Sequence, residues 1–339
     1  MKKRSKYLLL LVALLLCIVL MFRMRERKHF YNNVGEVWTT SYHITYEARH
    51  DLGDSIEVIL RNIDNVASPY NDSSLVAAFN RDAIGGPADS LLLRLVRTSQ
   101  TVHDLSNGAF DPTVMPLVKA WKPYIKNETN TQPSRATIDS LLQFVGMQHI
   151  TLRGDSIVKD DPRTQVDFSA IAKGFACDEI AQMLQRNGVK NLMVEIGGEV
   201  AMRGVNSHGD KWHISVDAPT DANSHVSALV IAMTDGAVAT SGNYRQYRAT
   251  KSHIVDPRTG DCLVGDLLSA TIVANDCMTA DAWATACMVL GTERTQQLLG
   301  NREDIGVMTI SAGTDGNLVV WSNARFADLY LTQTNADAD

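Results

Sequence analysis

Helix-like and strand-like patterns alternate along this chain from Glu36 onward, and no long linker, low-complexity tract or internal repeat separates them. Strand-like patterns occupy residues 38–47, 191–196, 212–217, 228–233 and 268–274. Apolar residues recur at helical spacing over 55–66, 89–107, 134–144, 168–187 and 280–290, where Gly291 is expected to end the helix. This interleaving predicts one mixed α/β (α+β) domain, with antiparallel strand pairing in its second half.

The N-terminal segment differs from the rest of the chain. Four basic residues, Lys2, Lys3, Arg4 and Lys6, precede an unbroken apolar run over residues 7–22. A basic region followed by an apolar region is typical of an export signal. The run is slightly shorter than the roughly 20 residues that cross a bilayer. Lysine and arginine side chains at its ends can reach the polar interface, so the run could still serve as an anchor.

We expect this segment to remain attached. Cys17 is preceded by Leu16, where lipoprotein cleavage requires a small residue, and no small-x-small cleavage site follows. An uncleaved anchor is therefore favoured over a lipoprotein. The basic stretch 23–28 competes with the first basic cluster, so the orientation is less determined than export itself. We expect the folded part to lie on the periplasmic side of a bacterial inner membrane.

These features divide the chain into residues 1–29, an export signal or membrane anchor with its tether, and residues 30–335, a single large domain. Residues 23–35 as a whole are polar and are interpreted as a tether. Hydrophobic residues make up 45% of the chain and charged residues 21%, a composition that suits a sizeable core and excludes wholesale disorder.

Charge and cysteine content narrow the classes of ligand. A net charge of −6 argues against nucleic-acid binding, which usually requires a basic face. Because the chain is negatively charged overall, a phosphate-bearing ligand would need a metal ion or backbone amides at its site to neutralise the phosphate charge. The five cysteines show no paired C-x-x-C spacing of a metal site, and a disulfide stays possible. Cys177 and Cys287 lie in apolar helical patterns and are interpreted as small buried residues.

Two polar, glycine-containing segments in the first half have candidate functional residues. In 107–113, Gly108 and Pro112 can simply end a helix, but that role requires neither an aromatic residue nor a carboxylate between them. In 166–174, Asp167 precedes a predicted helix start, whose free N–H groups favour an anion. Lys173 adds a positive charge there. Its structural alternative is an ordinary solvated helix lysine.

Two further segments lie in the second half. The turn-like stretch 252–260 contains His253, which is either a general base or a structural histidine. In 276–285, Asp281 and Thr285 are four residues apart, so their oxygens share one helix face and suit Mg²⁺. Alternatively, Thr285 bonds back to the carbonyl of residue 281, and Asp281 only favours the helix N-terminus.

Taken together and in this order, the segments resemble the ApbE family of FAD:protein FMN transferases. The resemblance spans nearly the whole exported part. Its matching pieces are GAFDPTV at 108–114, DFSAIAKG at 167–174, EIGGE at 195–199, ATSG at 239–242, SHIVDPRTG at 252–260 and MTADAWAT at 278–285.

The resemblance implies a T-fold-like domain with FAD as substrate and with family roles at matching positions. The positions that match FAD-binding residues are Trp38, Tyr70, Ala109, Phe110, Asp111, Asp167, Lys173 and Ile254. The positions that match Mg²⁺ ligands are the carbonyl of Ala170 and the side chains of Asp281 and Thr285. His253 matches a histidine near the phosphates. The family often has Met-Gly-Thr where this chain has Trp38-Thr39-Thr40, so Trp38 is the weakest correspondence.

The implied reaction is Mg²⁺-dependent transfer of FMN from FAD to a threonine or serine hydroxyl of an exported redox protein, with release of AMP. Asp281 and His253 are the expected catalytic residues, and His253 or a nearby carboxylate would accept the hydroxyl proton. Mg²⁺, Lys173 and backbone amides would neutralise phosphate charge. Two alternatives stay open: an FAD pyrophosphatase that uses water instead, and an FAD-binding protein without turnover.

Overall fold

The computed structural model describes residue 14 and residues 28–126, 128–217, 227–242, 247–248, 251–252, 254–313 and 317–330. Within these ranges, no helix is both long enough and apolar enough to cross a membrane. The predicted anchor lies almost wholly outside the described residues, as do Cys17 and His253. The anchor therefore stays a prediction.

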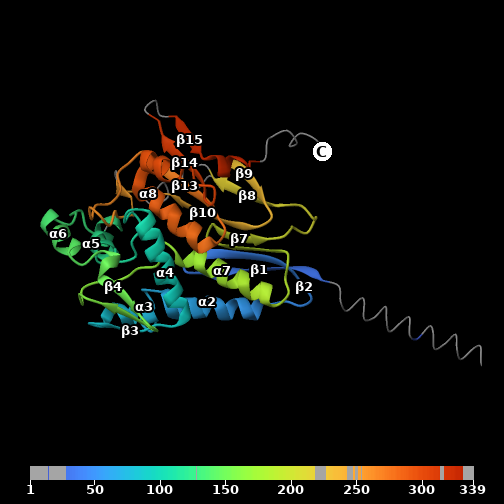
Figure 1. Cartoon of the computed structure of the whole chain (residues 1–339), viewed down its shortest axis with the longest axis horizontal. Helices are drawn as coiled ribbons and strands as arrows, with labels where there is room; N and C mark the ends of the chain where they lie inside the picture. Colours follow the sequence, from blue (N-terminus) through green and yellow to red (C-terminus); the bar gives the residue numbers. More distant parts are fainter. Residues whose placement is uncertain are drawn as a thin grey trace, which may run out of the picture.

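An antiparallel sheet of eight strands runs through the domain in the order β1-β2-β6-β7-β10-β13-β14-β15 (Figure 1). The strands are β1 (His29–Val37), β2 (Thr40–Ala48), β6 (Leu192–Ile196), β7 (Glu199–Arg203), β10 (Gly236–Gly242), β13 (Leu267–Ala274), β14 (Gly306–Ala312) and β15 (Leu318–Ser322). Every neighbouring pair is antiparallel. The prediction of antiparallel pairing in the second half is confirmed.

Smaller elements surround this sheet. Three short strands, β3 (Gly85–Pro87), β5 (Ser156–Lys159) and β4 (Ile150–Arg153), form a second sheet, and two strand pairs join β8 (Trp212–Asp217) to β9 (Ser227–Met233) and β11 (Tyr247–Arg248) to β12 (Lys251–Ser252). The helices are α2 (Gly53–Ala67), α3 (Leu75–Arg81), α4 (Ser90–Leu105), α5 (Met115–Ile125), α6 (Arg135–Leu142), α7 (Ala172–Arg186), α8 (Cys277–Leu299) and α9 (Ala324–Ala327), with a 3₁₀ turn at Met147–His149.

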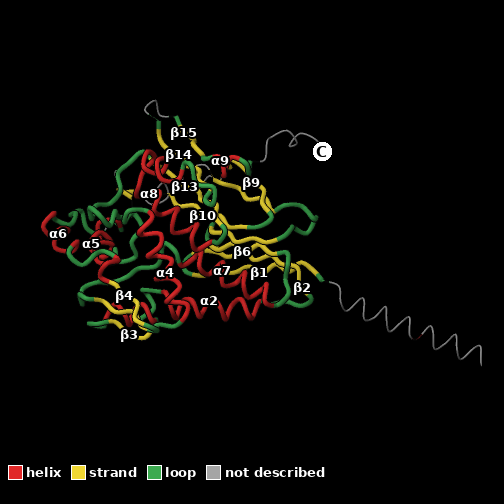
Figure 2. The backbone as a smooth tube through the Cα atoms, in the orientation of Figure 1, coloured by secondary structure: helices red, strands yellow, loops and turns green. Residues whose placement is uncertain are grey.

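The central strands of the large sheet are buried on both faces. Helices α7 and α8 pack on one face, and α2 and α4 pack against these two helices (Figure 2). On this face Ile44 and Ala201 join Phe175 and Trp283 in the main core. The β8–β9 pair and α9 pack on the other face in a second core. Because successive strand residues point to opposite faces, Ala201 belongs to the first core and its neighbour Met202 to the second. The structure is thus a single mixed α/β domain, as predicted.

Two predictions about local structure are wrong. The tether predicted for 23–35 includes strand β1, which pairs with β2 from His29 opposite Ala48 to Val37 opposite Thr40. Its position at the sheet edge tolerates the polar residues that suggested a tether. The helix predicted from residue 168 begins only at Ala172, because Asp167 Oδ1 accepts from Ser169 N (2.9 Å) and forms a turn there.

The last predicted helix begins earlier than expected and ends at Gly291, as predicted. Helix α8 begins at Cys277, where Asp276 caps it by accepting from Thr279 N at 2.8 Å. Gly291 adopts φ 73°, which is outside the helical region, so the predicted helix ends there. A second helical segment, which shares the label α8, follows this kink and continues to Leu299. The cysteines Cys177 and Cys287 are buried thiols, as predicted.

Candidate active site

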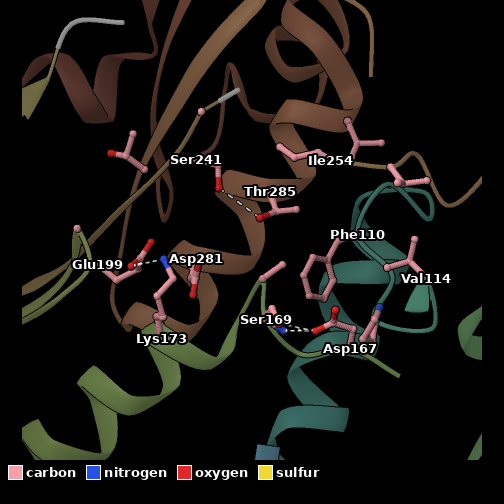
Figure 3. Close-up of a pocket in the computed structure, with 18 of the residues that line it drawn as sticks. Phe110, Val114, Asp167, Ser169, Lys173, Glu199, Ser241, Ile254, Asp281 and Thr285 are labelled. Carbon is pink, nitrogen blue, oxygen red and sulfur yellow. Dashed lines mark hydrogen bonds and ion pairs between the residues drawn. The ribbon is translucent and has the colours of Figure 1, made fainter. Parts of the chain in front are cut away.

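A pocket of about 530 Å³ opens where the ends of α7 and α8 meet the loops at 108–114 and 252–260 (Figure 3). Its walls bring together most of the side chains singled out in the sequence. The predicted residues that line it are Tyr70, Ala109, Phe110, Asp111, Asp167, Ala170, Lys173, Ile254, Asp281 and Thr285. These residues come from five stretches that are far apart in the chain, and the fold brings them together around one cavity.

One described residue of the predicted site, Trp38, is not among those that line the pocket. Trp38 lies in the two-residue turn between β1 and β2, where it and Thr39 have positive φ values of 49° and 64°, as tight hairpin turns require. Its ring N–H donates to Asp64 Oδ1 at 3.1 Å. His253 lies outside the described residues, although its chain neighbour Ile254 lines the pocket.

Helices α7 and α8 come unusually close at Gly174. A Cβ atom on this glycine would lie 2.2 Å from the carbonyl oxygen of Cys277 and 2.8 Å from Asp281 Cβ. The backbone N–H of Gly174 donates to Asp281 Oδ2 at 3.0 Å. The absence of a side chain at Gly174 thus lets the first turn of α7 hold the carboxylate of α8.

Lys173, Glu199 and Asp281 form a charged cluster at the base of the pocket. The Lys173 ammonium lies 2.5 Å from Glu199 Oε2 in an ion pair, and Figure 3 shows Asp281 beside them. The Lys173 side chain is 32% exposed and that of Glu199 only 3%. Lys173 is therefore neither a solvated helix lysine nor a freely mobile charge.

The pKa values in this cluster follow from burial and mutual charge. Burial would lower the pKa of Lys173, but the charges of Glu199 and Asp281 outweigh it and the pKa is raised. Burial and the neighbouring Asp281 raise the pKa of Glu199 to about 8. Burial also raises the pKa of Asp281, against the effects of Lys173 and the Gly174 N–H. Two buried carboxyls share one ammonium, so the cluster favours a further cation.

Oxygen ligands for such a cation are available around Asp281. The hydroxyl of Thr285 lies 3.2 Å from Ser241 Oγ on strand β10, and both residues line the pocket together with Ala170. In the part of the chain that the structure describes, no group of three or more His, Cys, Asp or Glu residues could hold a metal. One carboxylate with hydroxyl and carbonyl oxygens nevertheless fits Mg²⁺, which keeps several waters and needs few protein carboxylates.

The carboxylate of Asp111 is occupied by protein groups. Its Oδ1 accepts from the N–H and the hydroxyl of Thr113 at 2.8 and 2.5 Å, and its Oδ2 accepts from Met147 N at 3.2 Å. His103 Nδ1 lies 3.2 Å from the same Oδ2, and this bond raises the pKa of His103. In this structure, Asp111 holds the 108–114 loop in shape. Its predicted contact with FAD stays a prediction.

Aromatic side chains lie on the side of the pocket opposite the charged cluster. Phe110 is buried, whereas Tyr70 is 66% exposed, and the Lys122 ammonium sits 5.2 Å from the Tyr70 ring centroid. Burial and the charge of Asp167 raise the pKa of Tyr70. An aromatic wall facing a charged base suits a ligand with a flat ring at one end and phosphate at the other.

Reasoning from the sequence missed two residues of this site, Glu199 and Ser241. Both lie in quoted motifs, EIGGE and ATSG, but neither had a role assigned. Gly197 and Gly198 have positive φ values of 64° and 104° and form the tight β6–β7 turn that delivers Glu199 to the pocket. The double glycine of the EIGGE motif was the feature of the sequence that could have indicated this turn and the position of Glu199 after it.

Because Lys173 and Glu199 form an ion pair, we expect single and double substitutions of them to change the free energy of unfolding in a non-additive way. Lys173→Met should destabilise the fold by about 2 kcal/mol, below the 3–5 of a fully buried pair, because the lysine is partly exposed. Lys173→Met/Glu199→Gln should be more stable than Lys173→Met alone, since Glu199 no longer needs a partner. Urea unfolding of the wild type, both single variants and the double variant tests this. Additive losses would show that the pair does not couple.

Comparisons with known proteins show which family and which individual proteins this chain is similar to. A sequence model of the ApbE family matches residues 38–309. A Vibrio cholerae protein named FAD:protein FMN transferase is 33% identical over 294 residues, covering 83% of this chain and 87% of that protein. An Escherichia coli protein of the same name is 30% identical over 313 residues, covering 89% of this chain and 88% of that protein.

Solved structures agree with the sequence matches. The flavin transferase ApbE from Vibrio cholerae has a TM-score of 0.80 at 32% identity and covers 89% of this chain and 99% of its own. The apo form of the Pseudomonas stutzeri flavinyl transferase ApbE also has a TM-score of 0.80, at 29% identity, and covers 90% of this chain and 97% of its own. The family model spans all the described residues that line the pocket.

Proposed function

The chain belongs to the ApbE family, and from this premise we infer that it is an enzyme that transfers FMN from FAD to another protein. The observation that supports this most directly is the pocket, in which an aromatic wall faces the cluster of Lys173, Glu199 and Asp281. The flavin ring would lie near Tyr70 and Phe110. The pyrophosphate would lie toward Lys173 and the first turn of α7.

The chemistry joins an acceptor hydroxyl to the FMN phosphorus. A new P–O bond forms to the acceptor oxygen, the bond between the two FAD phosphates breaks, and AMP leaves with the bridging oxygen. Lys173 stabilises the negative charge on the phosphate oxygens, and Glu199 keeps the lysine in place. We propose that His253 accepts the proton of the hydroxyl, as the sequence resemblance implies. It would do so from beside Ile254.

We further propose that the reaction requires Mg²⁺. The carbonyl of Ala170 and the side chains of Asp281 and Thr285 would hold the ion, and when bound it would neutralise charge on the phosphates. Support comes from the excess of buried carboxyls over cations in the charged cluster and from the neighbouring hydroxyls of Thr285 and Ser241. These are the hard oxygen ligands that Mg²⁺ prefers.

The acceptor and the location also belong to this proposal. We propose that the acceptor is an exported redox protein that presents a threonine or serine, and that the domain lies on the periplasmic side of the inner membrane, anchored by residues 1–29. The basic and apolar residues of that segment support export. Mass spectrometry of periplasmic proteins from cells with and without this gene would identify the acceptor by an added FMN mass.

Incubation of the purified protein with FAD, MgCl₂ and a candidate acceptor tests the reaction. We expect covalently bound flavin on the acceptor and release of AMP, and we expect EDTA to stop both. Free FMN and AMP without a labelled acceptor would indicate a pyrophosphatase instead. Intact FAD in every sample, with several acceptors tried, would indicate a binding protein without turnover. Transfer that continues in EDTA would remove Mg²⁺ from the proposal.

A further inference from the structure

Helix α8, which contributes Asp281 and Thr285 to the pocket, is fastened to α7 by a second carboxylate outside the pocket. Asp178 Oδ1 accepts from Cys277 N at 2.9 Å, and Asp178 Oδ2 accepts from Met278 N at 2.8 Å. Cys277 and Met278 are the first two residues of α8. The side chain of Asp178 is therefore bonded at both oxygens to the N-terminus of the neighbouring helix.

The contact of Asp178 with α8 stabilises the helix end and also fixes the position of that end relative to α7. The first N–H groups of a helix have no partner within it, and a carboxylate there also interacts favourably with the helix dipole. Asp276 already caps α8 through Thr279 N. Because Asp178 bonds to two successive amides, it sets both the height and the rotation of the first turn of α8 against α7.

The first turn of α8 controls where Asp281 points. Asp281 lies four residues after Cys277, one helical turn further along the same face. Gly174 N, one turn before Asp178 on α7, donates to Asp281 Oδ2. The two helices are thus joined by hydrogen bonds at two successive turns, the inner one at the pocket and the outer one at Asp178. If the first turn of α8 shifts relative to Asp178, the carboxylate of Asp281 therefore moves relative to Gly174 and the pocket.

The buried surroundings of Asp178 disfavour the charged form of its carboxyl group. Asp178 is only 5% exposed, and its burial raises its pKa to about 7, although the N–H groups of Cys277 and Met278 act in the opposite direction. Its neighbour Glu179 is also buried but pairs with Arg94 of α4, and neither residue lines the pocket. Glu179 has no part in the attachment of α8 and offers a matched comparison.

We propose that Asp178 is a positioning residue of the transfer reaction: it holds α8 in the register that presents Asp281 and Thr285 to the metal and the phosphates. The inference rests on the proposed function for the identity of the reaction. It concerns a residue that touches neither the substrate nor the metal. Groups of this kind that orient metal ligands typically contribute about 10–100-fold to metal affinity or activity.

Asp178→Asn tests the proposal, because an amide can accept from only one of the two N–H groups and turns its NH₂ toward the other. MgCl₂ is titrated calorimetrically into the FAD-loaded protein without acceptor. We expect the Mg²⁺ concentration for half-saturation to rise at least about tenfold. The affinity for FAD measured without Mg²⁺ should stay within about twofold, since Lys173 and α7 are unchanged. The kcat of transfer should fall more than KM for FAD rises.

Glu179→Gln is the control. It changes another buried carboxylate, one residue along the same helix, to the corresponding amide, so it controls for the loss of a buried charge on α7. We expect its Mg²⁺ titration to match the wild type. If Asp178→Asn and Glu179→Gln have the same Mg²⁺ affinity, Asp178 does not position the site and the proposal is wrong.

Cys277→Pro provides a second route should Asp178→Asn fail to fold. Besides the thiol, it removes the backbone N–H that bonds to Asp178 Oδ1 and leaves the N–H of Met278 in place. Proline is tolerated at the first residue of a helix, and Asp276 already has the extended backbone (φ −133°, ψ 153°) that proline requires before it. Cys277→Ala loses the same thiol but keeps the N–H. We expect Cys277→Pro to bind Mg²⁺ more weakly than Cys277→Ala. Equal affinity would contradict the proposal.

The titration also separates this inference from the proposed function. If the wild type labels no acceptor, the transferase function fails, while the Mg²⁺ affinities of the variants still decide whether Asp178 positions the metal site. If the wild type transfers FMN and Asp178→Asn binds Mg²⁺ normally, only the role of Asp178 is lost.

Discussion

Asp281→Asn should lower the rate of FMN transfer by on the order of 10²–10³-fold, the effect expected when one preorganised electrostatic group is removed from an active site. Asparagine has nearly the same volume, so it leaves no cavity in the buried first turns of α8. Its amide oxygen can still accept from Gly174 N, which Asp281 Oδ2 does at 3.0 Å. What it removes is the negative charge beside Lys173 and Glu199.

The stability of the Asp281→Asn variant should equal or exceed that of the wild type. Burial makes an ionised carboxylate unfavourable at this position and raises the pKa of Asp281, although Lys173 and the Gly174 N–H act in the opposite direction. Transfer is measured by the appearance of covalent flavin on the acceptor, and stability by urea unfolding. Glu293→Gln, an exposed position on the same helix, is the control. Undiminished transfer by Asp281→Asn would show that the metal site lies elsewhere.

Gly174→Ala should destabilise the protein by about 3 kcal/mol, the upper end of the usual effect of overpacking, and should abolish transfer. The new methyl group would lie 2.2 Å from the carbonyl oxygen of Cys277, which belongs to the backbone and cannot rotate away. Helices α7 and α8 would have to separate. Separation breaks the bond from Gly174 N to Asp281 and moves Asp281 away from Lys173.

Gly86→Ala is the matched control for this prediction. Nothing lies within 4 Å of the Cβ that it would add, and Gly86 is not among the glycines with positive φ. Its effect on the free energy of unfolding should stay within about 0.5 kcal/mol, as for most surface substitutions. Urea unfolding and the transfer assay are applied to both variants. A Gly174→Ala protein as stable and active as Gly86→Ala would mean that the helices can move apart without consequence.

Local patterns in the sequence were sufficient to predict many of the helices and strands. The strand predicted at 212–217 is β8 residue for residue, because the alternation of buried and exposed side chains repeats every two residues and requires no knowledge of the partner strand. The pairing of Asp281 with Thr285 on one helix face follows equally from helical spacing. In contrast, residues 29–35 look like a polar tether until β2 is present to pair with them.

The chain by itself determined which segments have polar, glycine-containing chemistry and the family to which they belong. It could not determine which charges meet. Glu199 reaches Lys173 only because the β6–β7 turn reverses the chain, and Asp178 reaches Cys277 across 99 residues of sequence. Ion pairs and hydrogen bonds depend on distances in space, and spacing along the chain predicts those distances only within a single helix or strand. The tertiary structure therefore decided that Lys173 is held by a buried carboxylate, and that one helix fixes the position of the other.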